Sequence, residues 1–222
     1  GTDQLSLIKH GILSTERLVD IKSLPDMSGI EERSDRSVLI GALVTVTELA
    51  KSELIRKRYA VLQQAALKVA SPQLRNAATI GGNLCQRPRC WYYRGEFDCL
   101  RKGGDICYAV GGENKYHCIT GGDPCFIVHP SDIAVALLAL NANVHIFDGK
   151  SKKTVALSEF FVLPEEDPTR ETILQTGEII TGIEIPALPE GTVSRYEKVM
   201  ERGSWDFAVL SVAMVLEKQG TL

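Results

Sequence analysis

The stretch from residue 85 to residue 128 constrains the fold most, because it is dense in Gly, Cys, Arg and Tyr and shows little helical or strand periodicity. It contains Cys90, Cys99, Cys107 and Cys125. A loop of this length without secondary structure of its own is uncommon in a compact domain, unless it is functional or is ordered by a ligand. We therefore expect an insert (residues 85–128) whose shape is held by a bound group rather than by a core.

The composition is typical of a globular chain that buries a core of its own. Of the 222 residues, 44% are hydrophobic and 24% are charged, and the formal net charge of −3 provides no general field that would attract nucleic acid. No run of about 18 apolar residues is present, so no membrane span is predicted. The sequence begins at Gly1 and ends at Leu222 soon after an apolar run, so both ends are expected to be fragment ends.

Three explanations of the cysteines are open: a metal site, structural disulfides and free thiols. A chain of this length does not need disulfides for stability, and the clustering favours a metal. The spacing C-x8-C-x7-C-x17-C lacks the close C-x2-C pairs of zinc ribbons and common ferredoxins, which demotes zinc without excluding it. Thiolates on a glycine-rich loop can surround an iron–sulfur cluster. Cys118 competes for a ligand position, whereas Cys85 is expected to pack as a small apolar residue.

A glycine turn directly precedes the insert. Gly81 and Gly82 are flanked by Thr79 and Asn83, so backbone amides and a hydroxyl are available to bind a pyrophosphate. The turn matches neither the dinucleotide fingerprint G-x-G-x-x-G nor the P-loop, and a plain turn is the alternative. Residues 1–3 could be the remnant of a similar loop, but three residues alone do not decide this.

Hydrophobic periodicity predicts an α+β chain. Thr45 starts a short helix with a capping box that is completed three residues later, and helical spacing predicts a second helix over 59–69. A further helix over 133–140 is expected to be capped by Ser131 or Asp132. The expected strands are 5–8, 17–21, 38–42, 143–147, 154–157 and 178–185.

Four segments occur in a fixed order: VASPQLRNAATIGGNL (69–84), PSDIAVALLAL (130–140), EIITGIEIP (178–186) and YEKVMER (196–202) with Asp206 after it. Together they resemble the FAD-binding medium subunit of molybdenum hydroxylases, a family that includes xanthine dehydrogenase, carbon monoxide dehydrogenase and aldehyde oxidoreductases. The resemblance covers nearly the whole chain. It implies an α+β FAD-binding domain of the PCMH-like type over residues 1–186, truncated at its start, and the truncated start of a C-terminal α+β domain over 187–222.

The cysteine insert resembles that of one branch of the family, which includes 4-hydroxybenzoyl-CoA reductase and periplasmic aldehyde oxidoreductase and carries a [4Fe-4S] cluster there. The segments QRPRCWYYR (86–94) and HPSD (129–132) look closest to the aldehyde oxidoreductase type. The resemblance implies Cys90, Cys99, Cys107 and Cys125 as the ligands of the cluster. Cys118 does not fall on a ligand position of that pattern.

The resemblance also implies which residues bind FAD. Asp132 would bond to the ribityl chain or the flavin, Ile180 would pack on the ring, and Lys198 would lie at the flavin edge. Without the resemblance, Asp132 is a helix cap, Ile180 a core residue and Lys198 a solvated surface charge. The residues implied for the pyrophosphate and ribityl region are Gly1, Thr2, Asp3, Thr79, Gly81, Gly82 and Asn83.

The implied function is electron transfer within a complex. The chemistry on the organic substrate would occur at a molybdenum cofactor in a large partner subunit, and electrons would pass through a [2Fe-2S] subunit to this FAD and then to a small-molecule acceptor. A stand-alone FAD-dependent oxidoreductase and a non-enzymatic, metal-stabilised interaction subunit are the alternatives. We expect a cytoplasmic complex, with export to the periplasm together with a partner subunit as the alternative.

Overall fold

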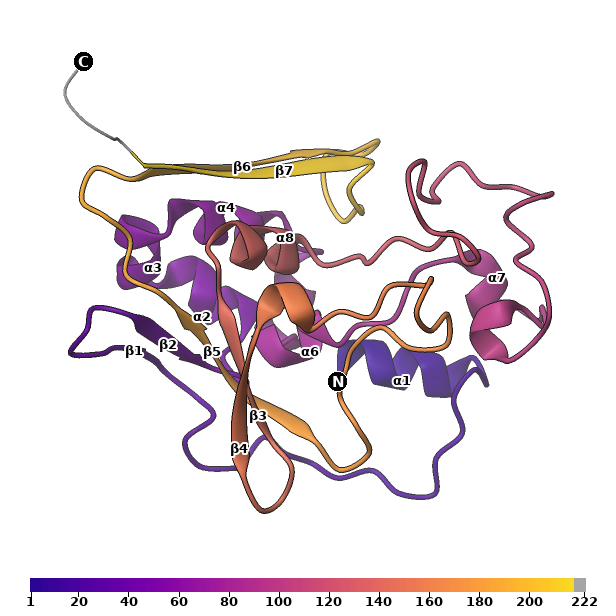
Figure 1. Ribbon diagram of the computed structural model, residues 1–222, viewed down its shortest axis with the longest axis horizontal. Coiled ribbons are helices and arrows are strands. Elements are labelled where there is room, and N and C mark those ends of the chain that lie inside the picture. Colours follow the sequence, from indigo (N-terminus) through magenta and orange to yellow (C-terminus); the bar gives the residue numbers. More distant parts are fainter. Residues whose placement is uncertain (218–222) are drawn as a thin grey trace.

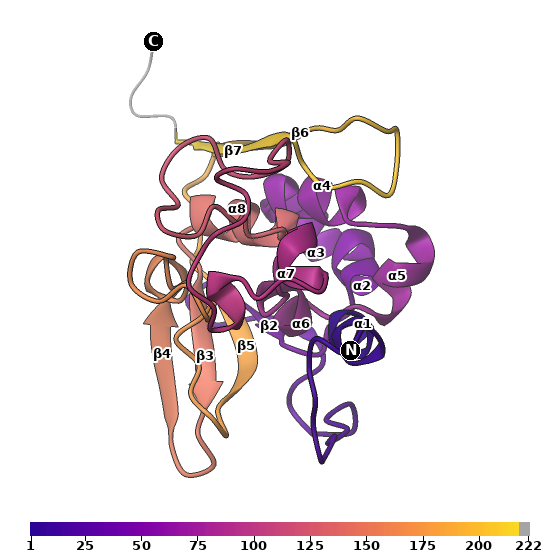
Figure 2. The same ribbon diagram turned by 90° about the vertical axis from the view of Figure 1, so that its right-hand side faces the viewer.

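Two antiparallel sheets enclose a layer of helices in the computed structural model, which describes residues 1–217 (Figures 1 and 2). The larger sheet has the order β1-β2-β5-β3-β4, and the smaller one pairs β6 with β7. The strands are β1 (Ile30–Glu32), β2 (Val38–Gly41), β3 (Asn143–Phe147), β4 (Lys152–Ala156), β5 (Ile179–Ile185), β6 (Val193–Val199) and β7 (Leu210–Leu216). Runs rich in Val and Ile form most of these strands because branched side chains pack well on a pleated surface.

The helices lie mainly between the two sheets and at one end of them (Figure 1). They are α1 (Thr2–Lys9), α2 (Val46–Lys51), α3 (Glu53–Arg58), α4 (Ala60–Lys68), α5 (Pro72–Ala77), α6 (Ile80–Leu84), α7 (Trp91–Arg94) and α8 (Asp132–Ala139). The capping box predicted at Thr45 is confirmed, since its hydroxyl accepts from the Glu48 amide and the Glu48 carboxylate accepts from the Thr45 amide. The helices predicted over 59–69 and 133–140 are confirmed as α4 and α8.

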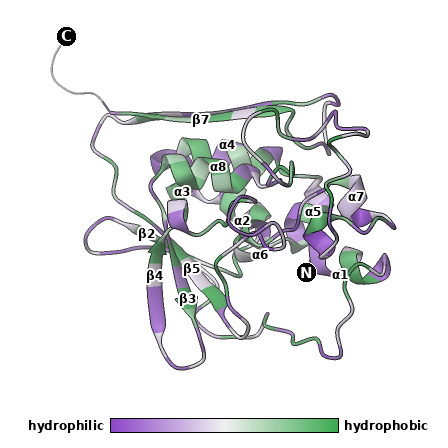
Figure 3. Ribbon diagram, turned by 45° about the vertical axis from the view of Figure 1, so that its right-hand side comes forward, coloured by the Kyte–Doolittle hydropathy of each residue, from purple (hydrophilic) through white to green (hydrophobic). Residues whose placement is uncertain are grey.

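The main core fills the space between the larger sheet and the central helices. Leu62 of α4, Leu137 of α8 and Ile183 of β5 are each fully buried in it. Helices α2, α4 and α8 are largely hydrophobic, whereas the edge strand β4 is hydrophilic (Figure 3). Charged residues on an edge strand discourage pairing with other chains. The hairpin of β6 and β7 lies across α4 and α8 on the opposite side from the larger sheet.

Two predicted strands are wrong. Residues 5–8 belong to helix α1, in which Leu7 is buried against Tyr93 and Cys99 of the insert. Residues 17–21 form no strand and are largely exposed. A short apolar run does not distinguish a strand from a helix, and packing against the insert decides between them here. The strands predicted at 38–42, 143–147, 154–157 and 178–185 are confirmed within a few residues as β2, β3, β4 and β5.

The insert lies at one end of the molecule beside α1, as an irregular chain that contains only α7 and a 3-10 turn, Leu100–Lys102 (Figures 1 and 2). This agrees with the lack of periodicity in its sequence. Among residues 1–217, no helix combines the length and the apolar character that a bilayer crossing requires.

Candidate cofactor sites

The predicted glycine turn is the short helix α6, and Thr79 is its N-cap. Thr79 is extended, with φ −102° and ψ 159°, and its Oγ1 accepts from the Gly82 amide at 3.2 Å. The amides of Ile80 and Gly81 donate to the carbonyls of Val44 and Ala42, so backbone groups already occupy them. Gly82 is exposed, and the Thr79 hydroxyl still has a proton to donate. The open part of this turn is therefore Gly82 with the Thr79 hydroxyl.

Asn83 joins this turn to the start of α8. Its Oδ1 accepts from the Ser131 hydroxyl at 2.5 Å, and the Ser131 oxygen in turn accepts from the Ala134 amide at 2.9 Å. Ser131 is thus the N-cap of α8, which decides between the two caps that the sequence allowed. The bond between Asn83 and Ser131 is buried, so it holds α6 and α8 in a defined relation.

Asp132, at the first position of α8, forms a buried ion pair with Lys198 of β6. The two side chains are 7% and 1% exposed, and Lys198 Nζ lies 2.8 Å from Asp132 Oδ2. The Tyr196 hydroxyl donates to Asp132 Oδ1 at 2.6 Å, and Lys198 also donates to the carbonyls of Asp206 and Lys68. Lys198 is therefore not a solvated surface charge, and Asp132 is more than a helix cap.

Burial and hydrogen bonding have opposite effects on the pKa of Asp132. Burial raises the pKa of Asp132, while the ammonium of Lys198 and the hydroxyl of Tyr196 oppose the increase. Burial also raises the pKa of Tyr196, and its bond to the carboxylate adds to that increase. Tyr196 therefore stays protonated and acts as a donor. The hairpin is tied to α8 by polar contacts as well as by packing.

A cavity of about 600 Å³ opens beside this ion pair, between the insert, the start of α8 and the β6–β7 hairpin. A cavity of this size is in the range of ligand and cofactor sites. Asp132 lies on its wall, with Arg89 and His117 of the insert and Phe207 before β7. Arg89 and Asp132 place opposite charges on the wall, and Phe207 adds apolar surface.

Asp3 connects the N-terminal helix to the base of the insert. Its carboxylate accepts from the Arg87 amide and from Arg94, both at 2.8 Å, and it pairs with Arg89. Although burial opposes the change, these bonds lower the pKa of Asp3. Arg89 also donates to Gln86, which donates to the Asn83 carbonyl. Asp3 therefore reaches the α6 turn through arginine and glutamine side chains.

The other residues predicted to bind FAD are divided between the surface and the core. Gly1 and Thr2 are exposed at the start of α1. Gly81 is buried, and an added Cβ would lie 3.0 Å from Ala42. Ile180, in strand β5, is 6% exposed and packs in the main core. The structure thus brings Asn83, Asp132 and Lys198 together, while Ile180 lies in the core.

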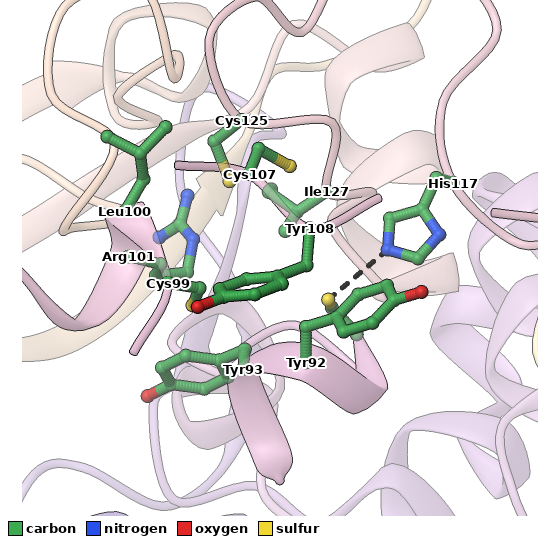
Figure 4. A pocket seen from close by; sticks show the side chains of 11 residues that line it. Tyr92, Tyr93, Cys99, Leu100, Arg101, Cys107, Tyr108, His117, Cys125 and Ile127 are labelled. Carbon is green, nitrogen blue, oxygen red and sulfur yellow. Dashed lines mark hydrogen bonds between the residues drawn. The ribbon is translucent and has the colours of Figure 1, made fainter. Parts of the chain in front are cut away.

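The four predicted cysteine ligands line one small cavity inside the insert (Figure 4). It measures about 10 Å³, which is the space of about one water molecule. Cys99 and Cys125 are buried, and Cys90 and Cys107 are partly buried. Cys118 does not line this cavity, and its sulfur is 3.7 Å from the Gly121 carbonyl oxygen, but its backbone amide donates to the carbonyl of Phe126, next to Cys125. Within residues 1–217, no three His, Cys, Asp or Glu side chains are grouped closely enough to hold a single metal ion.

Arg101 is the charged group of this cavity. Its side chain is 1% exposed and pairs with the carboxylate of Glu171. Its Nε and Nη2 have no hydrogen-bond partner among the described residues. Burial raises the pKa of the Cys125 thiol, and Arg101 opposes that increase. The charge of Arg101 is thus balanced by Glu171, and its remaining N–H donors are directed toward the region of the four cysteines.

Sequence reasoning did not find Tyr196, Arg101, Glu171 or the arginine contacts of Asp3. Each of these contacts joins residues far apart in the chain, such as Arg101 and Glu171, and periodicity carries no information about such pairs. The density of arginine in the insert was the available signal, because a loop rich in buried arginine needs carboxylates from elsewhere.

His129, on the wall of the larger cavity, provides a pH test of this region. Its Nε2 is buried with no partner among the described residues, and burial lowers its pKa from 6.5 to about 4. The unfolded chain therefore binds a proton more readily, so stability present above pH 6.5 is lost as the pH falls toward 4. We expect the free energy of unfolding to fall by about 2 kcal/mol between pH 7 and pH 5 through this group.

Denaturant unfolding of the wild type and of His129→Gln at the two pH values measures this contribution. The variant should lose about 2 kcal/mol less on acidification. His10→Gln, at an exposed position, should retain the wild-type dependence. Equal pH dependence in the wild type and His129→Gln would contradict the prediction.

Comparison with known proteins shows to which family this chain belongs. The protein family described as FAD binding domain in molybdopterin dehydrogenase matches residues 1–188. The chain belongs to this family. The description of this family therefore makes the chain the FAD-binding part of an oxidoreductase.

Individual family members cover the same range. The aldehyde oxidoreductase FAD-binding subunit PaoB of Escherichia coli is 38% identical over 225 aligned residues, which span 100% of this chain and 70% of that protein. The carbon monoxide dehydrogenase medium chain of Hydrogenophaga pseudoflava is 27% identical and is matched over 60% of its length. The solved carbon monoxide dehydrogenase of that organism superposes with a TM-score of 0.73 at 26% identity, covering 99% of this chain and 60% of the other. The α+β fold predicted from the sequence is thus confirmed as that of an FAD-binding domain of this family.

Proposed function

We propose that this chain binds FAD as the electron-transferring medium subunit of a molybdenum hydroxylase complex. The observation that carries the proposal is the buried connection from Asn83 through Ser131 to the Asp132–Lys198 pair, beside a cavity of cofactor size. FAD would supply hydride and single-electron transfer when bound. The residues of this chain then bind and orient it, and no acid–base pair is required of them.

The turn at α6 fits the phosphate end of FAD. Gly82 is exposed, and a Cβ added there meets only the Thr79 hydroxyl, at 3.1 Å. The absent side chain allows close approach to the backbone, and the Thr79 hydroxyl donates to phosphate oxygen. Gly1, Thr2 and Asp3 remain proposed members of this part of the site, with Asp3 acting through Arg89. Ile180 remains a proposed ring contact, although it lies in the core here.

Gly82→Val tests the FAD site separately from the fold. We expect the variant to lose most of its bound flavin, measured by absorbance after release by heat, because the branched side chain occupies the space of the phosphate. Gly203→Val, at an open position with no heavy atom near the added Cβ, is the matched control and should keep its flavin. Unchanged flavin in Gly82→Val, at unchanged unfolding free energy, would contradict the proposed site.

We also propose that the insert holds a [4Fe-4S] cluster on Cys90, Cys99, Cys107 and Cys125. Support comes from their convergence on one cavity, from the unpaired donors of Arg101 and from the chemistry of thiolates, which are the usual ligands of such clusters. The spacing of these cysteines lacks the close C-x2-C pairs of zinc ribbons, which makes zinc the less favoured metal without excluding it.

The cavity as it stands is smaller than a cubane, so the proposal requires the cysteine side chains to turn outward. Glycines in the left-handed conformation at 103, 121 and 122 mark places where the loop backbone turns sharply. Outside α7 and the 3-10 turn, the insert has no regular secondary structure, and such a loop adjusts with less loss of hydrogen bonds than a sheet would. Loop adjustment of this kind is the structural requirement of the cluster proposal.

The complex that we propose contains a molybdenum-cofactor large subunit and a [2Fe-2S] small subunit. Its electrons leave this chain for a small-molecule acceptor, and we propose no nucleic-acid partner. Residues 1–217 contain no helix long and apolar enough to cross a membrane. The alignment with an aldehyde oxidoreductase subunit makes an aldehyde-oxidising complex the first to test. The compartment stays a prediction, cytoplasmic or exported with a partner. Residues 187–222 stay the predicted start of a second domain.

An absorption spectrum of the protein, produced with its partner subunits and purified without oxygen, distinguishes the three functions. Flavin bands together with broad iron–sulfur absorption support the medium-subunit function. Flavin without iron, and no requirement for partners, favours a stand-alone flavoenzyme. Iron without flavin favours a metal-stabilised interaction subunit.

A further inference from the structure

Phe207 lies in the loop that joins β6 to β7, on the wall of the larger cavity. The residue is 48% exposed although its side chain is large and apolar. Other exposed large apolar side chains line the same cavity, namely Trp91, Tyr116, Val128, Val209 and Leu210. Exposed apolar surface that gathers around a cavity marks a ligand-binding site, and aromatic side chains are common in the walls of such sites.

The loop around Phe207 is fixed to the buried ion pair. Lys198 Nζ donates to the Asp206 carbonyl at 2.8 Å, and the Phe207 amide donates to Asp206 Oδ1 at 3.1 Å. Asp206 Oδ2 accepts from the amides of Glu201 and Arg202 at 3.0 and 3.1 Å, which closes the loop on itself. Phe207 therefore follows directly on the carbonyl that Lys198 binds.

A cation from the insert also contacts the Phe207 ring. The guanidinium carbon of Arg89 lies 5.4 Å from the centre of the ring, and Arg89 is itself paired with Asp3. A guanidinium over an aromatic face is attracted to it. Phe207 stays half-exposed despite this contact, so it has apolar surface left for a ligand in the cavity.

We propose that Phe207 contacts the isoalloxazine ring of FAD in this cavity and thereby positions the ring beside the Asp132–Lys198 pair. The inference rests on FAD binding under the proposed function, and it adds a ring contact that the sequence did not indicate. Aromatic rings pack favourably on one another in offset or edge-to-face arrangements. Ile180, by contrast, is 6% exposed and packs in the main core, whereas Phe207 offers open surface.

The test compares FAD with ADP, which carries the adenine and the diphosphate without the flavin ring. Each is titrated into the full complex after its flavin has been removed. We expect Phe207→Ala to weaken the affinity for FAD about tenfold, as the loss of an aromatic stacking contact does elsewhere, and to leave the affinity for ADP unchanged. Phe207→Tyr retains the ring and should bind FAD as the wild type does.

Trp205→Ala is the matched control. Trp205 is an aromatic residue of the same loop and is 62% exposed, but it does not line the cavity. This variant should bind both FAD and ADP with the wild-type affinity. A loss of FAD affinity in Trp205→Ala equal to that in Phe207→Ala would overturn the inference, because any change in the loop would then have the same effect.

Other outcomes separate this inference from the proposed function. If Phe207→Ala binds FAD as tightly as the wild type does, Phe207 is not a ring contact, while FAD binding stands. If the variant loses FAD and ADP affinity equally, Phe207 supports the fold of the loop and the inference is overturned. A wild-type protein that binds no FAD would reject the proposed function and this inference together.

A measurement on the wild type avoids dependence on the folding of a variant. FAD that carries a photoreactive azide on its isoalloxazine ring labels the residues next to the ring after illumination. We expect the label on residues that line the larger cavity, the loop over 200–209 among them. Label confined to segments that do not line this cavity would overturn the inference.

Discussion

Replacing Cys125 with serine is expected to remove almost all iron from the protein, whereas replacing Cys118 with serine should leave the iron content unchanged. Cys125 is 4% exposed and lines the small cavity with Cys90, Cys99 and Cys107. Cys118 does not line this cavity, although its amide donates to the Phe126 carbonyl next to Cys125; its sulfur lies near the Gly121 carbonyl. A cubane that loses one of four thiolates is held poorly, because hydroxyl oxygen is a weak ligand for a soft site. Cys90→Ser is expected to behave as Cys125→Ser does.

Iron and acid-labile sulfide are measured per chain on protein purified without oxygen. Cys118→Ser is the matched control, since it removes a thiol from the same loop. Cys125→Ala excludes ligation by the serine oxygen. Full iron in Cys125→Ser and Cys125→Ala would reject the ligand assignment, and iron loss in Cys118→Ser would place Cys118 in the ligand set instead.

The second large effect is expected at the buried ion pair. Lys198→Met should lower the free energy of unfolding by about 3–5 kcal/mol, because it leaves the Asp132 carboxylate buried without its cation. Lys198 also donates to two backbone carbonyls, and these acceptors lose their partner as well. Bound flavin should fall together with the stability. Denaturant unfolding at neutral pH measures the first effect and released flavin the second.

Two controls separate the buried charge from other causes. Arg195→Met breaks an exposed pair with Glu197 on the same strand, whose side chains are 65% and 59% exposed, and should cost less than about 1 kcal/mol. The double variant Asp132→Asn and Lys198→Met removes both charges and should recover part of the lost stability. A loss below about 1 kcal/mol in Lys198→Met would show that the pair is not essential to the hairpin.

The sequence predicted the central elements well where the pattern was strong. The capping box at Thr45, the helix over 59–69 and the strand over 178–185 are all present, because propensity, periodicity and packing agree there. Prediction failed at residues 5–8, where a short apolar run became a helix packed on the insert. The glycine turn became a helix start, since the Thr79 hydroxyl caps it.

In the candidate sites, too, the sequence indicated some residues but not the contacts between them. The sequence motifs indicated Asn83, Asp132 and Lys198 by resemblance, but not that Tyr196 completes the contacts of the Asp132 carboxylate. They indicated the four cysteines, but not that His117 contacts one of them or that Arg101 lies among them. Such contacts join segments that are distant in the chain, and only the folded arrangement determines which side chains meet.

By itself, the amino-acid sequence determined that the chain is an α+β domain with an aperiodic, cysteine-rich insert, because local periodicity and turn chemistry are properties of neighbouring residues. Only the tertiary structure decided that the four cysteines surround one cavity, that Cys118 is outside it, and that Asp132 is paired with Lys198. The physical reason is that burial and charge pairing depend on distances between residues that the fold, not the chain order, brings together.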